Sequence, residues 1–296
     1  MITIFTPTYN RGYVLPSLYA SLKTQTCKDF EWIVIDDNSS DNTCSLCSNW
    51  LQEQNDFDFQ YKKMEKNGGK QRAINQAVKL AKYDFFFIVD SDDYLMSDAI
   101  EQVVKWCEEI KDDDSFVGVS GIRCRKNGDY IIKPDFQGHP YIECTNIERE
   151  KYHLEADMAE VYKTEILKRY KFPVWHDETF TPEAVVWDQM ALDGYKMRYY
   201  DAKIYVCEYL DDGLTKGGNK LYYKNLIGTA MVYNIKLKYE SSLLEKIRLI
   251  REICVCCFFK KDLSYLKQSY HPIAAYLLLP VAYLYYLRRR RLFKKL

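Results

Sequence analysis

Glycine and proline are scarce in this sequence, and neither sign of charge is in excess. The 296 residues include 12 Gly and 8 Pro, which excludes collagen-like and linker-rich proteins. Lys and Arg together number 42, as do Asp and Glu, so no overall charge draws the chain towards nucleic acid. Hydrophobic residues make up 47%. We therefore expect a folded protein with a packed core, built as one large or two small domains.

Cysteine is too dilute for a disulfide scaffold. Ten are spread along the chain, and neither Cys44 with Cys47 nor the group at 254–257 has the matching second pair that a zinc site needs. We also expect no signal peptide, because Met1 leads directly into the strand-like residues 2–5. These features favour a cytoplasmic protein with reduced thiols.

Short aromatic and β-branched runs alternate with helical stretches in the first hundred residues. The pattern predicts strands at 2–5, 32–35, 57–61 and 85–89, with helices at 13–25, 41–54 and 70–81. Such alternation is typical of α/β folds with a Rossmann-like, mostly parallel sheet flanked by helices. Ligands of these sheets bind beyond the carboxyl ends of the strands, so the strand ends hold the candidate site.

The alternation loosens beyond about residue 115. The pattern there predicts a hairpin from 116–122 and 130–132 around Asn127 and Gly128, a helix at 183–192, an extended segment at 198–209, and mainly helix from 220. We therefore expect a main domain over residues 1–215 and a helical C-terminal tail over 216–296.

The end of the tail is apolar and then strongly basic. Residues 268–287 carry no charge, but the strongly apolar part, 273–287, is about 22 Å long as a helix, short of the roughly 30 Å hydrocarbon core. We expect Pro280 to interrupt it. Four arginines at 288–291, then Lys294 and Lys295, follow. This pattern favours an in-plane membrane anchor that prefers anionic lipid, and a core helix with a solvated basic end is the alternative.

Polar residues cluster after three of the first four predicted strands, at 6–11, 36–41 and 90–93. Any single cluster has a plain explanation, since Asp and Asn form turns and helix caps. In a parallel sheet, however, the three converge and bring at least four carboxylates together. Such carboxylates repel unless a cation neutralises them. Oxygen ligands of this kind suit Mg²⁺ or Mn²⁺ together with substrate phosphates, which predicts a nucleotide-diphosphate ligand.

Three motifs carry a resemblance to a known family. The segments 7–11 (PTYNR), 35–43 (IDDNSSDNT) and 89–93 (VDSDD) resemble, in order and spacing, the motifs of glycosyltransferase family 2. The resemblance is clear over roughly residues 1–100 and weaker to about 215. It implies the GT-A (nucleotide-diphospho-sugar transferase) fold and makes residues 1–215 the catalytic domain. It also implies inverting, metal-dependent hexosyl transfer from a UDP-sugar, as in bacterial surface-polysaccharide glycosyltransferases.

The resemblance also implies residue roles in donor binding. Tyr9, with Pro7 and Thr8, would hold the nucleotide base, and Asp37 would accept a hydrogen bond from the uracil imide. The segment before the third helix, residues 67–70 (NGGK), resembles the family's own, and its Lys70 would reach ribose or phosphate. A simple turn that opens the helix is the alternative for this segment.

Asp90, Ser91 and Asp92 would form the D-x-D motif. By the resemblance, Asp92 is the metal ligand and Asp90 lies near the ribose or the metal, with Ser91 beside the donor. The expected cofactor is Mn²⁺ or Mg²⁺. Asp93 follows directly, and sequence alone leaves open which neighbouring carboxylate touches the ion.

An inverting transfer needs a carboxylate that takes the acceptor hydroxyl's proton. Residues 182–188 (PEAVVWD) resemble the family's acidic segment, which makes Glu183 the first candidate base and Asp188 the second. Many members have adjacent Glu and Asp here, whereas Glu183 is followed by Ala184. A helix cap is the alternative role for Glu183.

Two further features lie nearby in the sequence. Residues 209–215 (YLDDGLT) resemble a segment that lines the acceptor site or closes over the diphosphate, with a polar turn as the alternative. None of the four histidines has metal-ligand spacing, and His176 is the one nearest to the predicted base.

These observations predict transfer onto a lipid-linked glycan in capsule, O-antigen or exopolysaccharide biosynthesis. The protein would sit peripherally at the inner face of the cell membrane, attached by its tail. A sugar nucleotidyltransferase is one alternative, although the glycine-rich phosphate loop is missing. A non-catalytic, membrane-associated scaffold that keeps the fold is the other.

Overall fold

The computed structural model describes residues 1–208, 210 and 218–293. The chain forms two compact units. One, the sheet unit, comprises Met1–Lys171 and Asp193–Leu210, and the other, the helical unit, comprises Phe172–Leu192 and Asp211–Leu296. The division into a catalytic domain over 1–215 and an extension over 216–296 concerns function and stays a prediction.

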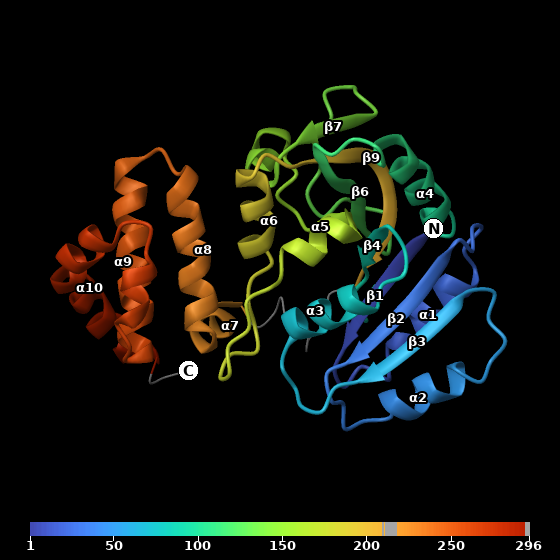
Figure 1. Ribbon diagram of the computed structural model, residues 1–296, viewed down its shortest axis with the longest axis horizontal. Coiled ribbons are helices and arrows are strands. Elements are labelled where there is room, and N and C mark those ends of the chain that lie inside the picture. Colours follow the sequence, from blue (N-terminus) through green and yellow to red (C-terminus); the bar gives the residue numbers. More distant parts are fainter. Residues whose placement is uncertain (209, 211–217, 294–296) are drawn as a thin grey trace. The chain divides into compact units, whose positions relative to one another are not determined.

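The sheet unit contains the strand and helix alternation expected from the sequence (Figure 1). Its elements are β1 (Ile2–Thr8), α1 (Leu15–Lys23), β2 (Phe30–Asp36), α2 (Thr43–Trp50), β3 (Asp58–Lys63), α3 (Lys70–Leu80), β4 (Phe85–Ile88), β5 (Tyr94–Leu95), α4 (Ala99–Ile110), β6 (Phe116–Arg125), β7 (Tyr141–Cys144), η1 (Asn146–Tyr152), β8 (Ala159–Lys163), α5 (Thr164–Arg169) and β9 (Lys196–Cys207). Each predicted strand and helix of the first hundred residues is present, with ends that differ by a few residues.

The strand order is β3-β2-β1-β4-β8-β6-β9-β5, and β7 pairs with β9. From β3 to β4 all neighbours are parallel, and Thr8 at the end of β1 lies opposite Asp36 at the end of β2. Beyond β4 the sheet is mixed, because β8 runs antiparallel to both β4 and β6. The expectation of a mostly parallel sheet therefore holds for the first half, which is the half that brings the three polar clusters to one edge.

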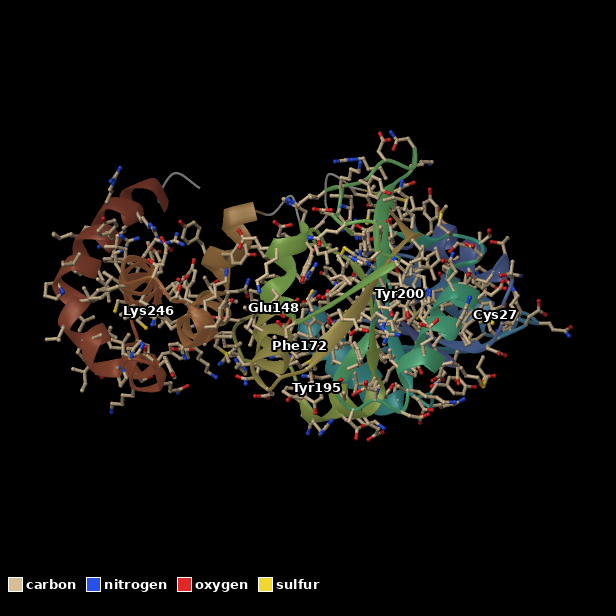
Figure 2. All side chains as sticks on the ribbon, turned by 90° about the horizontal axis from the view of Figure 1, so that it is seen from above. Cys27, Glu148, Phe172, Tyr195, Tyr200 and Lys246 are labelled. Carbon is tan, nitrogen blue, oxygen red and sulfur yellow. The ribbon has the colours of Figure 1, made fainter. Side chains whose placement is uncertain are left out.

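Aromatic side chains pack on both halves of this sheet. Trp32 on β2 is fully buried and stacks on Phe59 with ring centroids 4.7 Å apart. At the other end of the sheet, Tyr200 on β9, labelled in Figure 2, stacks on Trp106 of α4 at 4.3 Å. Buried aromatic side chains of this size contribute strongly to stability. This packing stabilises the sheet whose strand ends carry the polar clusters.

The predicted hairpin around Gly128 is much reduced. β6 runs on to Arg125, and within the described residues a single bridge joins Cys124 to Tyr130. Gly128 has a φ of +83°, which suits a tight turn. A full hairpin does not form because the strand positions beside β6 are occupied by β8 and β9.

The helical unit has a core of its own. Its elements are α6 (Ala184–Leu192), α7 (Gly218–Lys224), α8 (Leu226–Tyr239), α9 (Leu243–Lys260), η3 (Ser264–Gln268) and α10 (Pro272–Phe293). Ile253, Cys254 and Leu266 are buried together with Ala275 and Ala282 of α10. The last helix thus packs on the preceding ones through small residues.

The prediction that Pro280 interrupts the last helix is wrong. α10 continues through Pro280, although proline lacks the N–H for the helical hydrogen bond and its ring crowds the carbonyl four residues earlier. The fully buried Ala275 and Ala282 pack on either side of this point, and that packing holds both halves of the helix. Among the described residues, no helix is long and apolar enough to span a membrane.

Candidate functional site

The loops after β1 and β2 are tied together by side-chain hydrogen bonds. The Asn10 backbone N–H donates to Ser39 Oγ at 2.8 Å, and Asn10 Oδ1 accepts from the Ser40 N–H at 2.8 Å. Asp41 Oδ2 accepts from the Gly12 N–H at 3.0 Å. Asn10 itself has a φ of +53°, a conformation that asparagine tolerates better than most residues. The first two polar clusters therefore form one connected edge.

Asp37 joins this edge to the start of α3. Its two carboxylate oxygens accept the backbone N–H groups of Gly68 at 2.8 Å and Gly69 at 2.6 Å. Burial raises the pKa of Asp37, and the two N–H donors oppose that rise. Gly69 has φ +87° and ψ 164°, a combination that is open only to glycine. The two hydrogen bonds to Asp37 and the conformation of Gly69 together fix the direction in which Lys70 leaves the loop.

Lys70 reaches the third polar cluster. Its Nζ lies 2.7 Å from Asp90 Oδ1, and Arg123 on β6 places NH1 3.3 Å from Asp90 Oδ2. Burial alone would raise the pKa of Asp90, but the two cations outweigh burial and lower the pKa to about 2. Asp90 is therefore a carboxylate held between two positive charges.

Asp92 and Asp93 have a different environment from Asp90. Burial, and then the nearby charge of Asp90, raise the pKa values of both. Asp93 accepts the Glu208 N–H at 3.0 Å, and Ser91 is buried between the aspartates. Among the described residues, no ion pair engages Asp92, and no three acidic, histidine or cysteine side chains gather as a metal cage. Asp92 fits a cation that takes one carboxylate and completes its shell with ligand phosphates.

Tyr9 stands exposed just past the end of β1. Its side chain is 47% exposed, whereas Thr8 before it is buried and its hydroxyl oxygen has no hydrogen-bond partner. Pro7 lies in the strand opposite Ile35. An exposed aromatic ring on a rigid strand end is suited to stacking against a flat ligand.

The two predicted base residues belong to the helical unit. The Glu183 backbone carbonyl accepts from the N–H groups of Val186 at 2.8 Å and Trp187 at 3.1 Å, so Glu183 stands directly before α6 and is partly exposed. Asp188 is buried within α6, and its Oδ2 accepts from the Tyr239 hydroxyl at 2.9 Å. Burial and Asp188 together raise the pKa of Tyr239.

Sequence reasoning missed Arg123, Glu178 and Asn225. The Glu178 carboxylate accepts two N–H groups in the first turn of α8, from Ile227 at 2.8 Å and Gly228 at 2.9 Å. Asn225 Oδ1 accepts from the backbone N–H groups of Thr179 and Phe180. These partners of Glu178 and Asn225, and the Asp90 partner of Arg123, lie at least 33 residues away in sequence, so local patterns give no signal.

His176 is exposed on the surface of the helical unit. Apart from Leu210, the predicted acceptor segment at 209–215 lies outside the described residues.

A comparison with protein families defines the class. The model of the family described as "Glycosyl transferase family 2" matches residues 3–171, more than half of the chain. The chain therefore belongs to glycosyl transferase family 2, as the three motifs predict.

One relative by sequence and two solved structures are similar to most of this chain. The chain is 26% identical over 282 residues to GalNAc(5)-diNAcBac-PP-undecaprenol beta-1,3-glucosyltransferase of Campylobacter jejuni, covering 93% of this chain and 82% of that protein. Staphylococcus aureus TarS 1-349 in complex with UDP-GlcNAc has a TM-score of 0.63 at 18% identity, covering 87% of this chain and 81% of that one. The mannosyltransferase PcManGT from Pyrobaculum calidifontis, in complex with GDP-Man and Mn²⁺, has a TM-score of 0.58 at 18% identity, covering 96% and 79%. The structural likenesses confirm the predicted GT-A fold.

Replacement of Asp37 by asparagine should loosen the start of α3. An amide offers one oxygen acceptor, so one of the two glycine N–H groups loses its partner, at a cost of about 1–3 kcal/mol. We expect faster hydrogen exchange at Gly68 and Gly69, measured by NMR. Asp58→Asn, at an exposed carboxylate paired with Lys82, should leave these amides unchanged. Unaltered exchange in Asp37→Asn would contradict the anchoring role.

Proposed function

We propose that the protein is an inverting, metal-dependent hexosyltransferase that moves a sugar from a UDP-sugar to an acceptor hydroxyl. The observation that carries this proposal is the edge where Asp37 fixes the loop before α3. Lys70, the first residue of α3, lies 2.7 Å from Asp90, two residues before Asp92. Family membership supports the class of reaction. The UDP-GlcNAc complex of TarS supports the nucleotide, and the glucosyltransferase name of the C. jejuni relative supports a hexose.

The donor is bound by residues of the sheet unit in this proposal. Tyr9 stacks on the base, and Pro7 and Thr8 shape the strand end beneath it. Asp37 accepts from the uracil imide through a lone pair that its two glycine N–H bonds leave unused. The positive charge of Lys70 attracts the diphosphate. These groups lie at the end of β1, directly after β2 and at the start of α3.

Asp92 is the proposed ligand for Mn²⁺ or Mg²⁺, and Ser91 lies beside the donor. Asp90 is the less suitable ligand because both of its oxygens already face cations. It is therefore assigned to a place near the ribose or to a secondary contact with the metal. When bound, the metal offsets the negative charge that grows on the departing diphosphate. The Mn²⁺ complex of PcManGT supports this cofactor.

Glu183 is the proposed base. It takes the proton of the acceptor hydroxyl while that oxygen forms a bond to the anomeric carbon, from the face opposite the diphosphate. The bond from the anomeric carbon to the phosphate oxygen breaks, and its electron pair leaves with the diphosphate. Glu183 is favoured over Asp188 because Glu183 is partly exposed, whereas Asp188 is buried.

The proposed acceptor is a lipid-linked glycan at the inner face of the cell membrane, in capsule, O-antigen or exopolysaccharide biosynthesis. Ile273, Leu277 and Leu284 of α10 are 77%, 76% and 66% exposed, and their spacing places them on one helix face. Arg288 and Arg290 are also exposed. An apolar face with basic residues at one end suits the surface of an anionic bilayer. The undecaprenol in the name of the C. jejuni relative supports such an acceptor.

Calorimetric titration with UDP tests the donor site. Wild-type protein should bind UDP more tightly with Mn²⁺ than without it, and Asp92→Asn should lose this difference because the metal loses its carboxylate. Asp98→Asn, at an exposed aspartate bonded to Gln102, is the matched control. Binding of GDP or dTDP instead would change the donor, and binding of no nucleotide would favour the scaffold alternative.

Glu183→Gln should keep its affinity for UDP and lose turnover by about a hundredfold or more, because the amide cannot take the proton. Transfer is measured as UDP release in the presence of acceptor. Asp188→Asn, which keeps an oxygen for Tyr239, should retain turnover. The reverse pattern would move the base to Asp188.

Membrane attachment is tested by Leu277→Glu combined with Leu284→Glu. The two carboxylates should abolish co-sedimentation with vesicles containing phosphatidylglycerol and leave UDP binding intact. These point changes are preferable to deleting α10, whose removal would expose the core around Ala275 and Ala282. Leu51→Glu, which adds a carboxylate at a 49% exposed leucine of the sheet unit, is the control. Undiminished sedimentation of the double variant would argue against the anchor.

A further inference from the structure

Arg123 is a nearly buried arginine that neither the motifs nor the family resemblance singled out. Its side chain is 12% exposed. Its Nε donates to the Met158 carbonyl at 2.9 Å, and its guanidinium carbon lies 4.2 Å from the centre of the Tyr205 ring. A carbonyl and an aromatic face thus fix the plane of the guanidinium, an arrangement that a lysine cannot reproduce.

The remaining side of this guanidinium faces the D-x-D segment. NH1 lies 3.3 Å from Asp90 and 3.8 Å from Asp93. Tyr205 contributes a second time, because its hydroxyl oxygen accepts the Asp90 backbone N–H at 2.9 Å. Asp90 is therefore held at its backbone by Tyr205 of β9 and at its side chain by Arg123 of β6.

Lys70 shares the same carboxylate from the opposite side, at 2.7 Å. If Arg123 neutralises Asp90, the ammonium of Lys70 can turn to another anion at little cost. Without Arg123, the Asp90 charge would hold Lys70 more strongly, since a partly buried charge requires a counter-charge.

We infer that Arg123 is a positioning residue of the donor site, which fixes and neutralises Asp90 so that Lys70 stays available to the donor's diphosphate. The inference rests on the proposed function. Arg123 acts through Asp90 and Lys70, and it touches neither the donor nor the reacting atoms.

The chain supplies a matched control in Arg149. This arginine is also largely buried, donates Nε to the Leu154 carbonyl at 2.6 Å, and pairs with Glu160 at 3.2 Å. Its guanidinium carbon lies 5.7 Å from the centre of the Tyr199 ring. Arg149 therefore has the same kinds of partner within the same unit, but its carboxylate is not part of the candidate donor site.

The test compares Arg123→Met with Arg149→Met by thermal melting and by titration of UDP with Mn²⁺. Both variants should melt at lower temperature than the wild type. Only Arg123→Met should weaken UDP binding. The loss should be on the order of tenfold, because Asp90 then holds Lys70 and the diphosphate loses the charge contact with Lys70. Arg123→Lys should recover part of that affinity. In transfer assays, the KM for donor should rise in Arg123→Met while the KM for acceptor stays unchanged.

A second comparison uses Asp90→Asn as the background. Adding Arg123→Met to Asp90→Asn should change UDP affinity by less than about twofold, because the carboxylate that Arg123 holds is gone. Wild-type UDP affinity in Arg123→Met, or an equal loss in Arg149→Met, would overturn the inference while the proposed function stands. A wild-type protein that binds no nucleotide would overturn both.

Discussion

The buried carboxylate of Asp37, which accepts two successive backbone N–H groups, is the constraint on which the rest of the edge depends. Loops that approach a ligand normally gain freedom from glycine, and Gly68 and Gly69 would give the start of α3 such freedom. By satisfying both glycine N–H groups, Asp37 removes it. The end of β2 thereby sets the origin of α3, and Lys70 meets Asp90 as a consequence. One side chain thus connects two of the three polar clusters.

The acidic residues after β4 divide into two kinds by their environment. Asp90 is compensated by cations and hydrogen-bonded at its backbone, so it is already satisfied without a ligand. Asp92, two residues further along the chain, is half-buried and its pKa is raised. An added cation would therefore stabilise its ionised form. Two carboxylates only two residues apart therefore have different electrostatic surroundings, because their neighbours differ.

Much of the sheet unit follows from the sequence, because alternation of strands and helices admits few topologies. The parallel order β2-β1-β4 alone suffices to gather residues near 10, 37 and 90. What escapes prediction depends on distant partners. Arg123 lies one residue beyond the predicted end of its strand at 122, and its partners are fixed only when β8 and β9 join the sheet. The antiparallel β8 breaks the expected parallel order for the same reason. Pro280 misleads because packing of Ala275 and Ala282 overrides a local backbone preference.

The segment from Asp90 to Asp93 is closed at both ends by the sheet. It leaves the sheet after β4 and re-enters it at β5, where Tyr94 and Leu95 pair with Val206 and Tyr205 of β9. So short a connection has little conformational freedom to lose. Its ordering entropy is lost during folding rather than during ligand binding. The aspartates are consequently preorganised, and an incoming ligand must adapt its own torsions to them.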